Sequence, residues 1–267
     1  MFFRVLVLFL IFGCESVNDL KSQNLRIISL VPSATDIIYL LNGDDVLVGI
    51  SNQDYYKKEK VGDMINPDYE KIIKLKPSLV ILTMPLHRKV AQELSKLNID
   101  TISISPESIE DIFNSILKLG KILNKEDRAK FVVDSLKSIL DSLKVDKTLS
   151  GNKVFYEIWD NPLWTAGNKT FINDILKFLN LENIFSDKEG YFSVLEEEVI
   201  KRNPDIIIIA HSNVKIEDVK NRKFWNNINA IKNNQVYIVD ENLFNKPGPN
   251  FVSAIKFLKS TLYSKGG

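Results

Sequence analysis

The chain has 267 residues, of which 45% are hydrophobic and 26% are charged. These fractions are ordinary for folded proteins, so they exclude a wholly disordered or collagen-like chain. Lys and Arg number 35 against 34 Asp and Glu, a formal net charge of +1, which gives no electrostatic reason to expect a nucleic-acid partner. The length fits one large domain or two of roughly 120 residues each.

The first residues have the pattern of an export signal with a lipid-attachment site. A positively charged start is followed by an unbroken apolar run, Val5 to Phe12, and Cys14 comes two residues later. This run is too short to span a bilayer, which takes about 20 residues, but it suits a signal peptide. We expect residues 1–13 to be removed and Cys14, which ends a stretch resembling a bacterial lipobox, to carry the lipid. The alternative is an ordinary signal peptide with an incidental cysteine. Residues 14–24 would form a polar tether.

Leu25 begins a region in which apolar strands alternate with helices. This alternation predicts an α/β fold with a mostly parallel sheet. We assign residues 25–122 to an N-terminal lobe, in which Val31 to Thr35 breaks the chain between the first strand and the first helix. The expected strands are residues 25–30, 46–50, 79–82 and 99–104, and the expected helices are residues 36–41 and 86–97.

Two helical stripes then follow each other, over residues 109–119 and about 125–144, with no strand pattern between them. Beyond them the alternation of strands and helices resumes. Strands are expected at residues 154–158, 206–209 and 235–239, and helices at residues 171–179, 194–202 and 251–263.

An internal echo relates the two halves. Residues 70–81 align without gaps on residues 197–208, at a constant offset of 127 residues (197 minus 70). Each copy reads as a helix, a proline that ends it, and an apolar strand. With a helical segment between the copies, the echo favours two similar α/β lobes joined by a helix. We therefore expect residues 123–146 to bridge the lobes, residues 147–267 to form the C-terminal lobe, and a cleft between the lobes to hold the ligand.

Catalytic signatures are absent from the sequence. It contains no Gly-x-Ser-x-Gly elbow, no His-Glu-x-x-His motif and no phosphate-binding Gly-x-x-x-x-Gly-Lys loop. The only cysteine is at the expected anchor, so the folded part has no cysteine nucleophile. His87 and His211 are the only histidines, and two histidines without a cysteine make a poor closed metal site. We therefore expect no enzyme, no cofactor of its own and no bare metal ion.

Several aromatic side chains lie in loops or turns near expected strand ends. Such rings suit a large flat ligand because they offer stacking and apolar area. The alternative for any one of them is that it caps the core. His87 and His211 follow the strands that the echo pairs, so both would lie near the cleft, unless they are ordinary loop histidines. The aromatic candidates are Tyr55, Tyr56, Trp159, Trp164, Tyr191, Phe192 and Phe244.

Several short segments carry a resemblance to a known family. They are Arg26 to Asp36, Val48 to Ser51, Asp54 to Tyr56, Val61-Gly62, Glu70 to Val80, Trp164 to Gly167 and Asn183 to Phe185. Together they resemble class III periplasmic solute-binding proteins, the receptors of ABC importers for cobalamin, ferric siderophores and haem. The resemblance covers residues 25–263 and implies two α/β lobes bridged by one long helix, with the ligand between them. It also implies an exported protein, lipid-anchored at the cell envelope, that delivers its ligand to a membrane permease and ATPase. We expect a monomer.

Within that family the sequence is most similar to the cobalamin-binding branch. The resemblance implies that Tyr55 or Tyr56, Trp164 and Tyr191 surround the corrin, and that the loop at residues 242–246 contacts its side chains. We expect Trp164 and Tyr191 to face each other across the cleft.

Cobalamin or a related corrinoid is therefore the first choice of ligand, and haem or a ferric siderophore is the alternative. Asn242 and Lys246 stand where close cobalamin-binding members have Asp and Arg. The tryptophan that this branch has after the third strand is Thr83 here, with Met84 beside it. A siderophore is an anionic chelate, and few basic residues lie in the expected cleft loops. If the ligand is haem, His87 or His211 could serve as an axial ligand.

Two other functional classes stay open. A hydrolase on the same two-lobed plan would need a nucleophile and a base, and the sequence displays no such pair. A sensor or adhesion subunit would bind the ligand without delivering it to a transporter.

Two glutamates are candidates for contact with the permease. Asn66-Pro67 reads as a helix N-cap and Ser193 to Glu196 as a capping box, which places Glu70 and Glu197 at the same fourth helical position. The alternative is that acidic residues simply favour the first turn of a helix. The resemblance implies that one surface glutamate of each lobe pairs with permease arginines. We expect both to be exposed on the same side of the molecule.

Overall fold

The computed structural model describes residues 25–143 and 150–263. The expected signal peptide, the tether and Cys14 lie outside the described residues. Within them, no helix is both long enough and apolar enough to cross a membrane.

Four parallel strands form the sheet of the N-terminal lobe, in the order β2-β1-β3-β4. Its strands are almost continuously apolar because helices cover both faces of the sheet. The strands are β1 (Ile27–Ser29), β2 (Leu47–Ile50), β3 (Leu79–Leu82) and β4 (Thr101–Ser103), and the helices are α1 (Pro32–Leu40), α2 (Tyr69–Leu75) and α3 (Arg88–Lys96).

The sheet of the C-terminal lobe is mixed, in the order β10-β9-β5-β6-β8, with β7 also paired to β5. Its strands are β5 (Lys153–Asp160), β6 (Leu163–Ala166), β7 (Glu182–Asn183), β8 (Tyr191–Ser193), β9 (Ile206–Ile209) and β10 (Val236–Ile238). Its helices are α6 (Phe171–Phe178), α7 (Glu196–Arg202), α8 (Ile216–Lys220), a 3-10 turn (Trp225–Asn227), α9 (Asn229–Lys232), α10 (Glu241–Phe244) and α11 (Phe251–Tyr263).

The echo in the sequence is also a repeat in the structure. Ile27 of β1 pairs with Leu79 of β3, and Val154 of β5 pairs with Ile206 of β9, both in parallel. Each member of the second pair lies 127 residues after its counterpart in the first. Helices α2 and α7 obey the same offset, and each ends at a residue with a left-handed backbone conformation. The prediction of two similar α/β lobes is confirmed.

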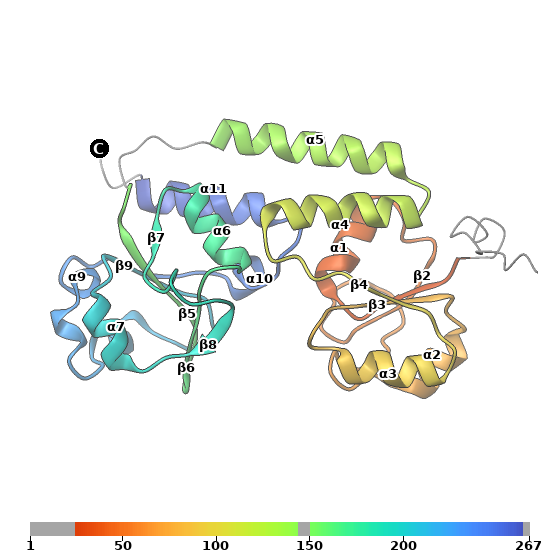
Figure 1. The fold of residues 1–267 in the computed structure, drawn as a ribbon, viewed down its shortest axis with the longest axis horizontal. Coiled ribbons are helices and arrows are strands. Elements are labelled where there is room, and N and C mark those ends of the chain that lie inside the picture. The colour runs from red at the N-terminus through yellow and green to blue at the C-terminus, as the bar shows by residue number, and fades with distance from the viewer. Residues whose placement is uncertain (1–24, 144–149, 264–267) are drawn as a thin grey trace, which may run out of the picture.

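The C-terminal lobe adds a hairpin to this shared unit. In the N-terminal lobe, β1 ends at Ser29 and α1 begins at Pro32. In the C-terminal lobe, β5 continues to Asp160, turns, and returns as β6 before α6 begins at Phe171. Strand β8 then pairs with β6 in antiparallel fashion. The additions form a patch of antiparallel sheet that the other lobe lacks (Figure 1).

Helix α5 (Glu126–Leu143) bridges the two lobes. It packs on α4 (Ile109–Ile122) and on α11, and Figure 1 shows it running above both lobes. Beneath it, one apolar core continues through α1, α4, α6 and α11. Phe113 of α4 meets Phe251 of α11 edge to face, with ring centroids 5.9 Å apart. The lobes are therefore joined by core packing.

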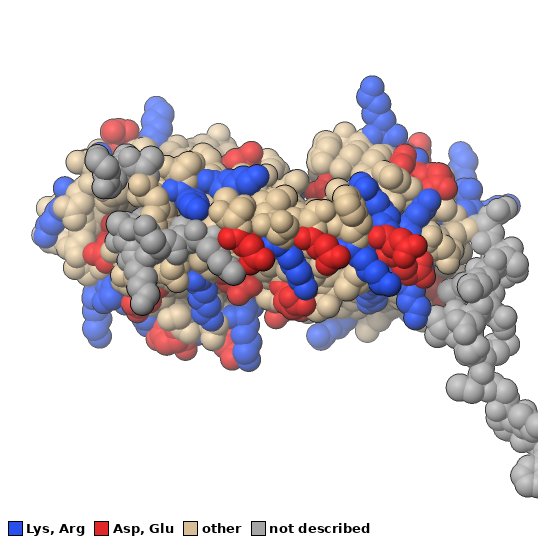
Figure 2. Space-filling model, turned by 90° about the horizontal axis from the view of Figure 1, so that it is seen from above, with Lys and Arg blue, Asp and Glu red and all other residues tan. Residues whose placement is uncertain are grey.

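The outer face of α5 carries charges of both signs. Figure 2 shows acidic and basic side chains interspersed along the centre of this face, with neither sign dominant. The opposite side of α5 buries Val132, Val133 and Leu136 against the core. This division into an apolar side and a mixed charged side is typical of a solvated surface helix.

Three predicted helix starts were wrong. Helix α1 begins at Pro32 and not at Asp36, because proline is well accommodated in the first helical turn. Helix α2 begins after Asp68, whose side chain accepts the N–H of Lys71 at 3.1 Å, because residues 66–68 are held extended by pairing with residues 61 and 62. Ser193 is a strand residue of β8, so it caps nothing, and α7 begins at Glu196.

Gly120 allows the close contact between α4 and α5. An added Cβ there would lie 2.4 Å from the Cβ of Ala129, so one helix would have to move. Replacing a helical glycine with alanine ordinarily stabilises a helix by up to about 1 kcal/mol. We expect Gly120→Ala instead to lower the free energy of unfolding by about 1–3 kcal/mol, because overpacking outweighs that gain. Urea unfolding measures this, with Ser138→Ala on the exposed side of α5 as the near-neutral control. A variant as stable as the wild type would contradict the argument.

Candidate ligand-binding site

The carboxyl ends of the parallel strands of the two lobes lie near each other. Gly248, in the loop after α10, packs against Ser33 in the first turn of α1, where an added Cβ would lie 3.1 Å from the Ser33 Cβ. Glu107, which follows β4, is close enough to act on the pKa of Tyr191 in β8. Ligands of open α/β sheets bind outside these strand ends. The junction of the lobes is therefore the natural place for a site.

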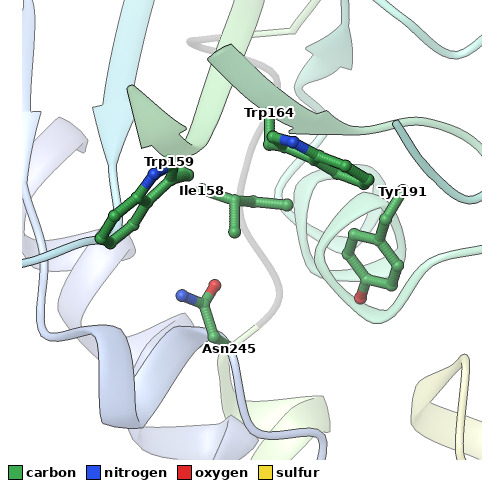
Figure 3. Close-up of a pocket in the computed structure, with 5 residues that line it drawn as sticks. All are labelled: Ile158, Trp159, Trp164, Tyr191 and Asn245. Atoms are coloured by element: carbon green, nitrogen blue, oxygen red, sulfur yellow. The ribbon is translucent and has the colours of Figure 1, made fainter. Parts of the chain in front are cut away.

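A hollow of ≈ 380 Å³ opens at this junction on the side of the C-terminal lobe. Figure 3 shows the indoles of Trp159 and Trp164, the ring of Tyr191 and the side chains of Ile158 and Asn245 around it. Trp159 and Ile158 come from the end of β5, Trp164 from β6, and Tyr191 from β8. Most of this wall is aromatic or aliphatic, and none of the five side chains is charged. We call these five residues the aromatic pocket.

The predicted clamp of Trp164 and Tyr191 across the cleft is wrong. Strands β6 and β8 are neighbours in one sheet, where Ala166 pairs with Tyr191 and Trp164 with Ser193. The two rings therefore line the same wall, in the same lobe (Figure 3). Both remain substantially exposed, with 38% of Trp164 and 54% of Tyr191 accessible. They offer a ligand adjacent surfaces and do not enclose it from two sides.

Asn245 supplies a polar contact of the aromatic pocket; it belongs to the predicted 242–246 loop, although the prediction did not single it out. The hydroxyl of buried Tyr156 donates to Asn245 Oδ1 at 2.8 Å, and Asn245 Nδ2 donates to the carbonyl of Ala210 at 2.7 Å. These bonds fix the orientation of the amide. The hydroxyl of Tyr191 stays protonated at physiological pH, because desolvation, and then the charge of Glu107, raise its pKa to about 12.

Behind the aromatic pocket lies a buried cluster of charged groups, of which the sequence analysis named only His211. The carboxylate of Glu157, fully buried on β5, accepts from Arg222 Nη1 at 2.5 Å and from Nη2 at 2.7 Å. The ring nitrogen Nε2 of His211, which is only 4% exposed, lies 2.9 Å from Glu157 Oε1. The His211 ring in turn lies 5.7 Å from the ring of Trp159.

The hydrogen bonds of this cluster outweigh the effect of burial on its acid. Burial alone would raise the pKa of Glu157, but the bonds from Arg222 and His211 bring it below its ordinary value. The bond to Glu157 likewise raises the pKa of His211, although burial acts in the opposite direction. Glu157 is therefore ionised at neutral pH. The partners of Glu157 are distant in sequence, so no local motif could have predicted them.

Tyrosines form the corresponding surface of the N-terminal lobe. Tyr56 stacks on Tyr39 with ring centroids 3.6 Å apart, and Tyr55 stacks on Tyr56 at 4.3 Å. The hydroxyls of Tyr55 and Tyr56 both donate to Asp36 Oδ1 of α1, at 2.9 and 3.0 Å. Tyr55 is largely exposed and follows β2 at the same carboxyl edge of the sheet. The stack is therefore a preformed, hydroxyl-rich surface.

Other predicted site residues are placed in the core. Phe192 alternates with Tyr191 along β8, so it points inward and meets Phe185 edge to face. Phe244 is almost fully buried against Phe257. His87 is fully buried before α3, where its Nδ1 accepts the N–H of Thr83 at 2.9 Å, and burial lowers its pKa. Phe244 and His87 offer no surface to a ligand in this structure, and Phe192 is partly buried against the core.

The remaining candidates lie on the surface. Met84 is exposed after β3, Asn242 is exposed in α10, and Lys246 is partly buried in the loop that follows. Glu70 and Glu197 are both exposed, and each is the second residue of its helix, not the fourth as predicted. Helices α2 and α7 lie on the side of the molecule opposite α5 (Figure 1).

The part of the chain that the structure describes holds no group of three or more His, Cys, Asp and Glu residues arranged for a metal ion.

The sequence profile of the periplasmic binding protein family matches residues 27–243. The chain belongs to this family. It is 33% identical over 258 residues to YvrC of Bacillus subtilis, an uncharacterized ABC transporter substrate-binding lipoprotein, with 91% of this chain and 82% of YvrC covered.

Two further comparisons agree with this family assignment. The vitamin B12-binding protein of Vibrio parahaemolyticus is 29% identical over 240 residues, covering 86% of each chain. The crystal structure of a possible iron-binding, periplasmic solute-binding protein of Staphylococcus epidermidis superposes with a TM-score of 0.79 at 34% identity, covering 89% of this chain and 98% of the other. The two-lobed fold predicted from the resemblance is confirmed.

The buried cluster of this binding protein yields a test with a defined pH dependence. Glu157→Gln leaves the Arg222 charge without its ionic partner, so we expect the free energy of unfolding at pH 7 to fall by about 3–5 kcal/mol. Because the folded-state pKa of Glu157 is lowered, its contribution is present above the ordinary value of 4.5 and is lost as the pH falls through the folded pKa. The difference between wild type and variant should therefore shrink in acid.

Urea unfolding at pH 7 and in acid measures both effects. The control is Glu198→Gln, which disturbs the partly exposed pair between Glu198 and Arg202 and should cost at most about 1 kcal/mol. Equal losses of unfolding free energy in the two variants would show that the buried cluster contributes no more to stability than a partly exposed ion pair.

Proposed function

We propose that this chain is the substrate-binding lipoprotein of an ABC importer and that its ligand is cobalamin or a related corrinoid. Support for the first part comes from the family and from the similarity to YvrC, a substrate-binding lipoprotein. Support for the second comes from the similarity to the vitamin B12-binding protein and from the aromatic pocket. The single observation that carries the choice of ligand is the uncharged aromatic wall that Trp159, Trp164 and Tyr191 form.

A corrinoid matches this wall in shape and in polarity. Its macrocycle is broad and apolar on its faces, so neighbouring indole and phenol rings can cover it. Its rim carries neutral carboxamides, which pair with neutral donors and acceptors such as the Asn245 amide and the Tyr55 hydroxyl. The pocket has a volume of ≈ 380 Å³, near the small end of the range of about 300–1,000 Å³ for ligand sites. A ligand as large as a corrinoid would therefore extend beyond it, toward the tyrosine stack of the other lobe.

An iron chelate is the second candidate, because the Staphylococcus epidermidis protein is described as a possible iron-binding protein. Ferric siderophores and haem carry carboxylate or other anionic groups, which are usually met by Arg or Lys. None of the five residues of the aromatic pocket is basic. The polarity of this wall therefore favours the corrinoid.

Trp164→Ala tests the aromatic wall. Losing the area and stacking of one indole should weaken cyanocobalamin binding roughly tenfold or more, equivalent to about 1–3 kcal/mol. Isothermal titration calorimetry measures the affinity, and titrations with haemin and a ferric siderophore compare the rival ligands. Phe131→Ala, which removes an exposed ring from α5, is the matched control and should bind normally. Tight binding of haemin or the siderophore, with none of cyanocobalamin, would overturn the choice of ligand.

We also propose that α2 and α7 dock on the permease through Glu70 and Glu197. Both carboxylates are exposed, and the repeat gives them equivalent positions in the two lobes. Leu195, 73% exposed, lies just before Glu197 and offers an apolar contact beside the charge. Exposed ion pairs contribute modestly to affinity but steer encounter and fix orientation. The lipid on Cys14 would hold the protein at the membrane face where this permease lies.

Replacing both Glu70 and Glu197 with Arg should abolish ligand uptake by cells that carry the intact transporter, because two attractive contacts become repulsive. Ligand affinity in solution should not change, since neither residue touches the pocket. The control is Glu126→Arg with Asp134→Arg, which makes the same change in net charge on the opposite side, over α5. Uptake at the wild-type rate in the first double variant would refute the docking assignment.

A further inference from the structure

His211 stands between the aromatic pocket and the buried cluster, and both of its ring nitrogens face oxygen atoms. Nε2 faces the carboxylate of Glu157 at 2.9 Å, and Nδ1 faces the carbonyl oxygen of Ser212 at 3.2 Å. Both oxygens are acceptors. A neutral imidazole has only one N–H and would leave one of these contacts without a proton, whereas the imidazolium donates to both. Two acceptors facing the two ring nitrogens favour the protonated ring.

We propose that His211 is a positioning residue for the ligand pocket: as an imidazolium held by Glu157, it fixes the indole of Trp159, which forms one wall of the pocket. The centroid distance of 5.7 Å between the two rings lies within the range of a cation–π contact. Trp159 needs such support because 49% of its surface is exposed. Within residues 25–143 and 150–263, the one hydrogen bond of its side chain runs from Nε1 to the carbonyl of Asn161, at 3.0 Å, in its own hairpin turn.

The cluster behind His211 is built for rigidity. Arg222 donates two hydrogen bonds to Glu157, and its guanidinium lies 4.6 Å from the centroid of the Trp225 ring. Trp225 is fully buried, and its Nε1 donates to Glu196 at 2.8 Å. A buried ion cluster is weak evidence for stability, since apolar residues of the same volume often stabilise as well. The hydrogen bonds of the cluster hold its side chains in fixed orientations, which apolar contacts alone would not do.

The position of Trp159 should therefore depend on pH. The groups that face His211 are Glu157 and Asp160 from β5, Arg222 beyond Glu157, and Glu241 of α10, which accepts the N–H of Ser212 at 3.2 Å. The bond to Glu157 raises the pKa of His211 above its ordinary 6.5. A raised pKa means that the support is complete below 6.5 and is lost as the pH rises through the folded-state value.

Tryptophan fluorescence tests this without any ligand, because an imidazolium quenches an adjacent indole. In the wild type we expect emission to rise as the pH is raised above 6.5 through the raised pKa of His211, because His211 then loses its proton. The step should vanish in His211→Gln and in Trp159→Phe, and it should persist in Trp164→Phe, the matched control from the same wall. A flat wild-type profile, or a step that persists in Trp159→Phe, would overturn the proposal. The Trp159→Phe arm keeps the test decisive even if His211→Gln fails to fold.

Ligand binding supplies a second readout, which rests on the proposed function. Cyanocobalamin affinity should weaken roughly two- to fivefold from pH 6 to pH 9 in the wild type, the size expected for one exposed cation–π contact. His211→Gln should show the weaker affinity at both pH values, with no further change. A fluorescence step without cyanocobalamin binding would refute the choice of ligand alone. Binding that is independent of pH in a protein that shows the step would refute the role of His211 in positioning the ligand wall.

Discussion

The placement of the two lobes' surfaces relative to each other depends on the packing of α5 against α4 in one lobe and α11 in the other. Because the two sheets do not pair, their strand ends can oppose each other only if these helices hold the lobes in register. A side-chain contact strengthens this arrangement: Asp174 of α6 accepts the N–H of Ile109 at the start of α4, at 2.8 Å. That bond supplies an acceptor to a helix terminus in one lobe from a side chain in the other.

Such a junction limits how the protein can gain affinity. The core runs without interruption from α1 through α4 and α5 to α11, and close-packed interiors transmit strain and resist gradual deformation. A large hinge closure would open this core. Affinity must then come from surfaces that are already in place, which reduces the entropy lost when the ligand binds. The stacked tyrosines and the braced indole are both preformed in this sense.

Glu157 shows how one strand can serve two purposes. Along β5, Phe155 and Tyr156 fill the core, whereas Glu157 places a carboxylate where another apolar residue would suffice for packing. The strand then emerges as Ile158 and Trp159, which line the pocket. A charge at this position costs desolvation energy, and two cationic donors compensate for it. The hydrogen bonds of Glu157 therefore orient the side chains around the end of β5, in addition to holding the core together.

Most of the architecture could be predicted because it depends on local patterns. Apolar runs located the parallel strands, and the gapless echo corresponds to a repeated strand register. The site was harder. The predicted strand ended at Ile158, and the residues from Trp159 to Trp164 were interpreted as a turn. The hairpin of β5 and β6 was therefore missed. Strand β8, whose alternation turns Tyr191 outward and Phe192 inward, was missed with it. The partners of Glu157 lie 54 and 65 residues away, a distance at which periodicity carries no information.

The two lobes are alike where a matched pair of contacts is proposed and differ where the ligand would bind. Helices α2 and α7 keep the same offset, length and left-handed ending, so Glu70 and Glu197 present equivalent surfaces. The ends of the neighbouring strands do not match: the C-terminal lobe inserts a hairpin with two indoles, while the N-terminal lobe uses a loop with two tyrosines over Asp36. If the proposed flat ligand lies between these surfaces, an apolar wall on one side and a hydroxyl and carboxylate surface on the other would distinguish its two faces. The divergence of the repeat can therefore determine the orientation in which that ligand is held.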